Sequence, residues 1–370
     1  MNINTDILKS DEKTIFKLRS LYLKHGYSRY KMNKFEEYEL YSHNKDFLVS
    51  DNIITFTDTN GKLMALKPDV TLSIIKNYGS KNGEVQKLCY DENVYRVSES
   101  TKSYKEIMQA GLECIGDIDR YCIFEVLYLA AESLKSISED FILDISQLDI
   151  LSSVLDSLEV SDESRKSLLK CVGEKNIHGI KEICARENKD SLKLSGLVSA
   201  YGSANSVIPA LKALIPKETE KLSELEEIVK ALESCGFKDK IKIDFSVVNS
   251  MKYYNGFVFK GFINGIETGI LSGGQYGRLM HKMGRKTEAI GFAVYLDNLE
   301  RLETSEKSFD TDAVLLYDDS QDLLSVKMAA ENILKDNKSI KVLKNIPKNL
   351  KYKKLYKLNE KGVKMLENNA

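Results

Sequence analysis

The apolar positions at the start of the chain recur at helical spacing. They lie three or four residues apart, at Ile15, Leu18, Leu21 and Tyr22. Ser10 stands where a helix cap is expected, and Gly26 stands where a helix ends. The pattern therefore predicts an opening helix over residues 10–25.

Two pairs of extended runs follow this helix. Residues 53–58 and 62–69 flank Asn60-Gly61, a dipeptide typical of a type I′ hairpin. Residues 85–97 and 105–116 are separated by a polar loop and predict a second, longer hairpin. The first sheet is therefore expected to be antiparallel.

The pattern changes in the middle of the chain. Residues 146–240 show almost only helical periodicity, with short polar breaks, and predict a helical insertion. Its last helix is the clearest, because Glu226 and Lys230 form an i,i+4 pair and Gly236 follows as a stop. Two elements are predicted before the insertion: a helix near residues 120–134 and a strand near residues 141–145.

Strand signals return after the insertion. Strict alternation over residues 241–247 and an aromatic, β-branched run over 253–262 predict two strands. Residues 268–280 indicate a strand, a glycine turn and a helix, and residues 289–302 repeat that order. The tail adds a strand at 313–318, a helix near 322–336 and a strand-like run at 340–346.

These elements predict an α+β protein with three parts. An antiparallel sheet flanked by helices is expected from residues 1–145 and 241–304, interrupted by the helical insertion at 146–240. Residues 305–370 are expected to form a small α/β domain. A tail of about sixty residues is small for an independent domain, so we expect it to lean on the rest.

Composition excludes several classes of protein. The 54 basic and 55 acidic residues give a net charge of −1, which disfavours a purely electrostatic nucleic-acid binder. The six cysteines form no CxxC pair and no zinc-like spacing with the four histidines, so we expect reduced thiols and no metal. Without an apolar run of about 18 residues or a basic, apolar leader, a cytoplasmic protein is expected.

Two short segments could carry chemistry. Asp69 in LKPDVT either caps the following helix or faces a ligand. Gln109 and Glu113 in QAGLE lie on one face of a strand, with Gly111 between them. That face is either solvated or a polar pocket, and periodicity does not decide between the two.

The order of six segments resembles the histidyl-tRNA synthetase core, a class II aminoacyl-tRNA synthetase fold. It resembles more closely a paralogue of that enzyme, the regulatory subunit of ATP phosphoribosyltransferase. The resemblance covers roughly residues 10–302, and the helical insertion sits where that family places one. The segments are ALKPDVT, LCYDENVYR, KEIMQAGLECIG, MKYYNGFVF, LSGGQYGRL and AIGFAVYLDNLERL.

The resemblance implies that cations needed for adenylate formation are missing. Asn249 falls where the synthetase has a catalytic arginine, and Asn298 falls on its ATP-clamping arginine. Removing one preorganised donor from such a site costs on the order of 10²–10³ in rate. Tyr295 replaces the glycine that leaves room for adenine, whereas Arg96 of the second motif is kept. Further departures from the family pattern are Met32, Asn33, Lys252, Gln275 and Gly277.

The positions around the amino-acid substrate are retained by contrast. By resemblance, Asp69, Thr71 and Gln109 offer acceptors to an α-ammonium, while Glu113 and Tyr254 meet the imidazole nitrogens. Tyr253 walls the pocket, and Arg96 completes the implied histidine-binding set. The alternatives are that both tyrosines are ordinary sheet aromatics and that Arg96 pairs with Glu92 or Glu99.

The resemblance implies a non-catalytic regulatory subunit of ATP phosphoribosyltransferase, a glycosyltransferase of the first step of histidine biosynthesis. Its implied partner is a short-form catalytic subunit, bound by a homodimer within a hetero-oligomer that transmits feedback by L-histidine. No cofactor, membrane or tRNA is expected; the lysine-rich residues 348–357 indicate a solvated face. The alternatives are an active histidyl-tRNA synthetase-like adenylating enzyme and an amino-acid-binding pseudoenzyme with another partner.

Overall fold

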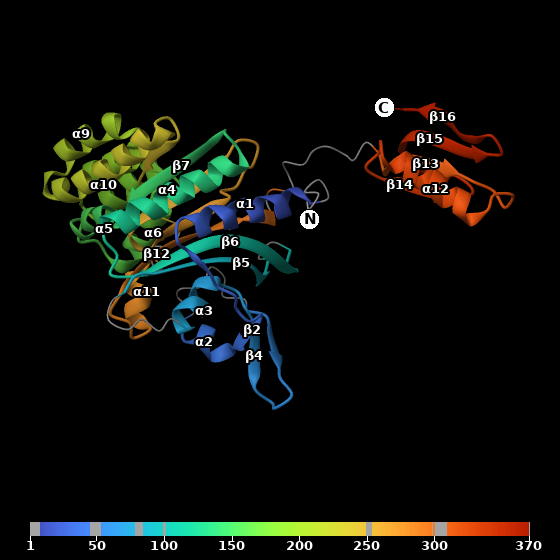
Figure 1. Ribbon diagram of the computed structural model, residues 1–370. Coiled ribbons are helices and arrows are strands. Elements are labelled where there is room, and N and C mark those ends of the chain that lie inside the picture. The colour runs from blue at the N-terminus through green and yellow to red at the C-terminus, as the bar shows by residue number, and fades with distance from the viewer. Residues whose placement is uncertain are drawn as a thin grey trace. The chain divides into compact units, whose positions relative to one another are not determined.

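The computed structural model describes residues 8–44, 53–77, 84–98, 101–248, 254–297, 299 and 309–369. The chain forms two compact units, Met1–Leu302 and Glu303–Ala370 (Figure 1). Within the described residues, no helix is both long and apolar enough to cross a membrane.

Among the described residues of the first unit, nine strands form one sheet, which is the framework of that unit. Its pairs are antiparallel except for β1 with β5 and β7 with β9, so the predicted antiparallel sheet is in fact mixed. The two exceptions involve strands of two and four residues that lie beside longer strands. The strands in spatial order are β1 (Ser28–Arg29), β5 (Gln86–Val97), β6 (Tyr104–Gly116), β12 (Glu288–Tyr295), β11 (Leu271–Gln275), β10 (Asn255–Ile263), β7 (Phe141–Gln147), β9 (Ile241–Asp244) and β8 (Tyr201–Gly202).

Two helices, α1 (Ser10–Lys24) and α4 (Arg120–Ile137), pack against one face of this sheet (Figure 1). The predicted helices are confirmed, but the cap of α1 lies one residue earlier, where Glu12 accepts a hydrogen bond from the backbone of Lys9. The buried Tyr22 and Ser133 hydroxyls hydrogen-bond at 3.0 Å between the two helices. Because these helices cover one face, the opposite face of β5, β6 and β12 is left for a site.

The β5–β6 hairpin confirms the longer predicted hairpin. The shorter one is confirmed in position as β3 (Thr55–Thr57) and β4 (Leu63–Leu66), within a small sheet of order β2-β4-β3 whose β2 covers Phe35–Glu37. Its turn is not type I′, because only Gly61 has a positive φ and the Asp58 carboxylate accepts from two turn amides. Helix α2 (Tyr38–Ser42) lies between β2 and β3 in the chain, and α3 (Val70–Asn77) follows β4.

The insertion is helical as predicted, apart from the two-residue strand β8. On α10, Lys230 reaches Glu226 at 2.5 Å, and Gly236 follows with φ +97°. Lys175, in the turn after α6, pairs with Asp244 of β9 at 2.7 Å and so ties the insertion to the sheet. The helices are α5 (Leu148–Asp156), α6 (Asp162–Gly173), α7 (Ile177–Arg186), α8 (Leu192–Ser199), α9 (Ala204–Leu214), the 3₁₀ turn η3 (Pro216–Glu218), α10 (Thr219–Leu232) and the π turn η4 (Glu233–Phe237).

The glycines of residues 273–274 lie inside β11, not in the predicted turn after it. A side chain at Gly273 would collide with Phe259 and Phe292, and one at Gly274 would meet Tyr254. These glycines therefore allow close packing of neighbouring side chains on both faces of the strand. Helix α11 (Gly277–Lys282) follows as predicted.

The second unit has its own apolar core beneath α12 (Leu323–Leu334). Its sheet has the order β14-β13-β15-β16, with β13 (Thr311–Leu316) parallel to β14 (Ile340–Leu343) and β15 (Tyr352–Asn359). The strand β16 (Gly362–Asn368) pairs with β15 in antiparallel fashion. The lysine-rich end thus contains a hairpin that the sequence pattern did not predict.

Asp144 of β7 gives the fold a pH dependence. Burial, and then the Asp244 carboxylate, raise its pKa to about 7. The folded-state pKa lies above the ordinary value, so stability is lost as the pH rises from about 4 through 7. When the pH rises from 5 to 8, we expect the free energy of unfolding of the wild type to fall by about 2–3 kcal/mol more than that of Asp144→Asn, as measured by urea unfolding. Equal pH dependence of the two proteins would contradict this. The control is Asp239→Asn, in an exposed turn, which should keep the pH dependence of the wild type.

Candidate functional site

The candidate site lies on the sheet face opposite α1 and α4. Gln109, Gly111 and Glu113 alternate along β6 toward this face, whereas Ala110, Leu112 and Cys114 belong to the core beneath the helices. Gln109 is 3% exposed and Glu113 is 2% exposed. The solvated-face alternative is therefore wrong, and both polar side chains belong to a buried site.

Glu113 is the centre of the site. Its carboxyl group accepts hydrogen bonds from the Thr71 hydroxyl at 2.7 Å and from the Tyr276 hydroxyl. Burial raises the pKa of Glu113 to about 8, although both hydroxyls act in the opposite direction. With a pKa of about 8, the group is mostly protonated at neutral pH, and a protonated carboxyl group can both donate and accept hydrogen bonds.

Room for this carboxyl group comes from the neighbouring strand. Gly291 of β12 is the register partner of Glu113, and a methyl group there would collide with the Glu113 carboxyl group and the Leu112 carbonyl. The small residue thus leaves the space that a buried carboxyl group needs on a closely paired strand.

Asp69 takes the first of the two roles that the sequence left open, that of a helix cap. Its Oδ1 accepts from the backbone N–H of Leu72 at 2.9 Å and so caps α3. Burial raises the pKa of Asp69, while the Leu72 N–H and the Arg96 guanidinium lower it. The Asp69 charge also raises the pKa of Glu113, which places both acids in one site.

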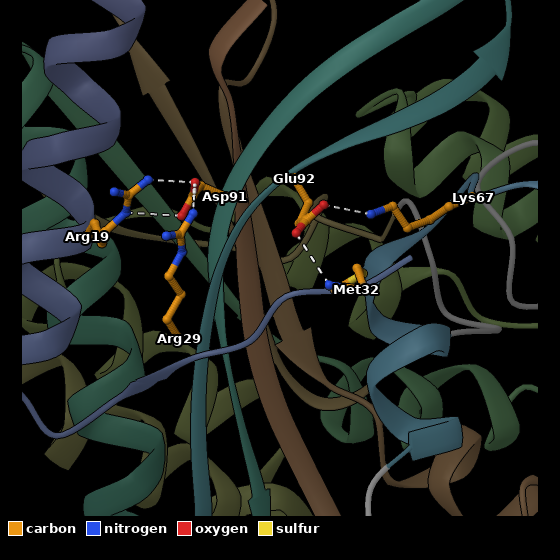
Figure 2. A network of polar contacts seen from close by, with 6 residues as sticks. All are labelled: Arg19, Arg29, Met32, Lys67, Asp91 and Glu92. Atoms are coloured by element: carbon orange, nitrogen blue, oxygen red, sulfur yellow. Dashed lines mark hydrogen bonds and ion pairs between the residues drawn. The ribbon is translucent and has the colours of Figure 1, made fainter. Parts of the chain in front are cut away.

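Arg96 and Lys67 hold the loop that carries Asp69. Arg96 Nε donates to the Pro68 carbonyl at 2.9 Å. Lys67 Nζ lies 2.9 Å from Glu92 Oε2 (Figure 2). Among the described residues Arg96 forms no ion pair with Glu92, so that suggested pairing is wrong. The other suggested partner, Glu99, lies outside the described residues.

Gln109 contributes an amide nitrogen to which no described residue is hydrogen-bonded. Its Nε2 is buried and has no hydrogen-bond partner within the described ranges. Its register partners are Glu92 on β5 and Tyr295 on β12. A buried amide without a partner is costly, so it indicates a position where a ligand or water would bind.

Two tyrosines close the site on the side of β11. Tyr254 is half-buried and packs against Gly274. Burial raises the pKa of its hydroxyl, and the nearby Tyr295, Glu113 and Asp69 raise it further. The Tyr295 hydroxyl hydrogen-bonds to Ser272 at 3.0 Å, so its ring lies across the face toward β11. Tyr254 thus packs as a core aromatic and also lines the site.

Other predicted positions divide into two groups. Gln275 and Gly277 are structural: Gln275 accepts from the backbone of Phe257 at 2.7 Å, and a side chain at Gly277 would collide with Glu288. Met32 N–H donates to Glu92 at 3.4 Å. Four further positions lie outside the described residues: Asn249, Lys252, Tyr253 and Asn298.

The structure brings together Asp69, Thr71, Arg96, Glu113 and Tyr254, with Gln109 on the same face. Sequence reasoning missed three residues that support Glu113 or its surroundings, namely Tyr276, Gly291 and the buried Tyr90 beneath Gly111. The tyrosine after the glycine pair was a usable signal for Tyr276, but the contact joins positions 163 residues apart. Within the described ranges, no group of His, Cys, Asp and Glu is arranged to hold a metal ion.

Comparisons with known proteins agree on one family. The sequence pattern of the family described as Histidyl-tRNA synthetase matches residues 6–299. An ATP phosphoribosyltransferase regulatory subunit of Thermoanaerobacter sp. (strain X514) is 32% identical over 291 residues, which are 76% of this chain and 75% of that protein.

Solved structures show the same fold. The chain is similar, at a TM-score of 0.75 and 24% identity, to an ATP phosphoribosyltransferase regulatory subunit/histidyl-tRNA synthetase from Bacillus halodurans, covering 94% of this chain and 93% of that one. It is also similar, at a TM-score of 0.62 and 19% identity, to a chain of the ATP phosphoribosyl transferase (HisG:HisZ) complex from Thermotoga maritima. That match covers 76% of this chain and 96% of that one.

The space beside Glu113 can be tested by filling it. Gly291→Ala should lower the free energy of unfolding by about 2–4 kcal/mol, because the added methyl group displaces a buried carboxyl group. In a Glu113→Ala background the same change should cost at least ~1 kcal/mol less. Urea unfolding of the four proteins measures this difference, and an equal cost in both backgrounds would show that Glu113 does not fill that space.

Proposed function

The chain belongs to the histidyl-tRNA synthetase family and, within it, to the ATP phosphoribosyltransferase regulatory subunits, and from this membership we propose that it binds L-histidine without activating it. It acts on a short-form catalytic subunit, enabling the first step of histidine biosynthesis and transmitting feedback. The first unit carries the synthetase-like core and the helical insertion; the second is a small α/β domain.

The observation that carries the proposal is the donor and acceptor set around Glu113. The Glu113 carboxyl group accepts hydrogen bonds from Thr71 and Tyr276, and its pKa of about 8 keeps it mostly uncharged at neutral pH. Such a group suits an imidazole nitrogen because it can donate or accept a hydrogen bond. Asp69 supplies carboxyl oxygens that accept from the α-ammonium, and the Gln109 Nε2, without a partner among the described residues, supplies a further polar contact.

The nucleotide side of the cleft supports a role without catalysis. Asn249 and Asn298 stand where the family's adenylating members carry arginines, and a neutral amide does not stabilise developing phosphate charge as a guanidinium does. The Arg96 Nε is committed to the Pro68 carbonyl. Tyr295 lies across the face where the resemblance places adenine.

Feedback requires that histidine bind two states of the assembly with different affinity. The proposed assembly is a homodimer of this chain joined to catalytic subunits, without membrane, cofactor or tRNA. Under this proposal the site binds histidine but does not activate it, so ligand binding serves only to shift the equilibrium between the two states.

The proposal is tested by mixing this protein with a short-form ATP phosphoribosyltransferase catalytic subunit. We expect phosphoribosyl transfer to ATP to rise at least tenfold over the catalytic subunit alone, and L-histidine to inhibit the mixture. With Glu113→Ala, the histidine concentration for half inhibition should rise at least tenfold, because the imidazole loses its buried partner.

No gain of activity on mixing would overturn the regulatory role. A gain of activity with inhibition that is unchanged by Glu113→Ala would keep the partner and remove this pocket from the feedback.

A further inference from the structure

Lys67 is a fully buried cation next to the candidate pocket, and the proposed binding role does not use it. Its side chain is 0% exposed, and its Nζ lies 2.9 Å from Oε2 of Glu92, whose side chain is 17% exposed (Figure 2). Burying two charges is costly, and a well-packed apolar pair of similar volume is often as stable. Stability alone therefore does not explain an ion pair here.

The loop before α3, which carries Lys67, is held by backbone contacts in addition to the ion pair. The Lys67 N–H donates to the Lys34 carbonyl at 3.0 Å, and the Lys67 carbonyl accepts from Tyr95 N–H at 2.9 Å. One residue later, the Pro68 carbonyl accepts from Arg96. Asp69 and Thr71 follow directly, so the position of their side chains depends on this anchored segment.

The ion pair also lies next to Gln109, whose Nε2 has no hydrogen-bond partner among the described residues. Glu92 is the register partner of Gln109 across β5 and β6, so the two side chains share one face. The Glu92 carboxylate is engaged by Lys67 at 2.9 Å and by the Met32 N–H at 3.4 Å (Figure 2). Within the described residues neither Glu92 nor any other group is hydrogen-bonded to the Gln109 Nε2.

We propose that Lys67 and Glu92 are positioning residues for the ammonium end of the amino-acid pocket. Lys67 orients the loop that presents Asp69 and Thr71, and it holds Glu92 away from Gln109, so that all three meet the ligand. This inference rests on the histidine-binding role proposed above. It assigns a function to a buried ion pair that touches no ligand itself.

The experiment is calorimetric titration of the full chain with L-histidine. In the double variant Lys67→Met/Glu92→Met, two apolar side chains replace both charges, so no unpaired charge remains. We expect its thermal unfolding midpoint to stay close to that of the wild type, while its dissociation constant for L-histidine rises at least tenfold.

A matched control tests whether any ion pair near α3 has this effect. Lys76 on α3 pairs with Glu36 of β2 at 2.8 Å, away from the Asp69 loop. The double variant Lys76→Met/Glu36→Met should bind L-histidine as the wild type does. Lys67→Arg keeps a cation beside Glu92 and should recover most of the affinity that Lys67→Met loses.

The outcomes separate this inference from the proposed function. Wild-type binding with unchanged affinity in Lys67→Met/Glu92→Met shows that the pair is structural only, and overturns the inference alone. Absence of wild-type binding overturns both the histidine pocket and its positioning residues. If the double variant does not fold, Glu92→Gln replaces it, with an expected three- to tenfold loss; unchanged affinity of Glu92→Gln would overturn the inference.

Discussion

A buried carboxyl group has to be supplied with hydrogen-bond partners by the protein around it, and Glu113 imposes this requirement on the whole cleft. Thr71 comes from α3 and Tyr276 from the segment that joins β11 to α11. The space comes from Gly291 on β12. Segments distant in sequence must therefore be in register before the group can be buried, and this ties the sheet, α3 and α11 to the pocket.

In the role we propose, the same requirement explains how the site binds a ligand that it does not activate. The groups around Glu113 satisfy one another through donors and acceptors, so they belong to the stability of the fold as well as to binding. Cations that face a nucleotide contribute nothing of this kind when no nucleotide is bound. The asparagines at positions 249 and 298, where the resemblance implies arginines, therefore leave the carboxyl network its own partners, and Tyr295 adds a hydroxyl contact to Ser272.

Local patterns predicted most of the fold, and the errors have physical causes. Alternation predicted the β5–β6 hairpin and placed Gln109 and Glu113 on one face, because period-two spacing is a local property. The strand β8 has only two residues, and β15 is rich in lysine, so neither gave a hydrophobic signal. The glycines of β11 were assigned to a turn because the tyrosine and phenylalanine rings that need their space come from other strands.

The candidate site was predictable only as far as single strands and the family resemblance reach. Asp69, Thr71 and Glu113 were expected together, but nothing local indicated that Tyr276 would reach Glu113 or that Lys67 would take Glu92. We propose that this site binds an amino acid and does not activate it. Histidine-dependent exchange of pyrophosphate into ATP measures activation directly: we expect no exchange above background at histidine concentrations that saturate the protein, and measurable exchange would contradict the proposal.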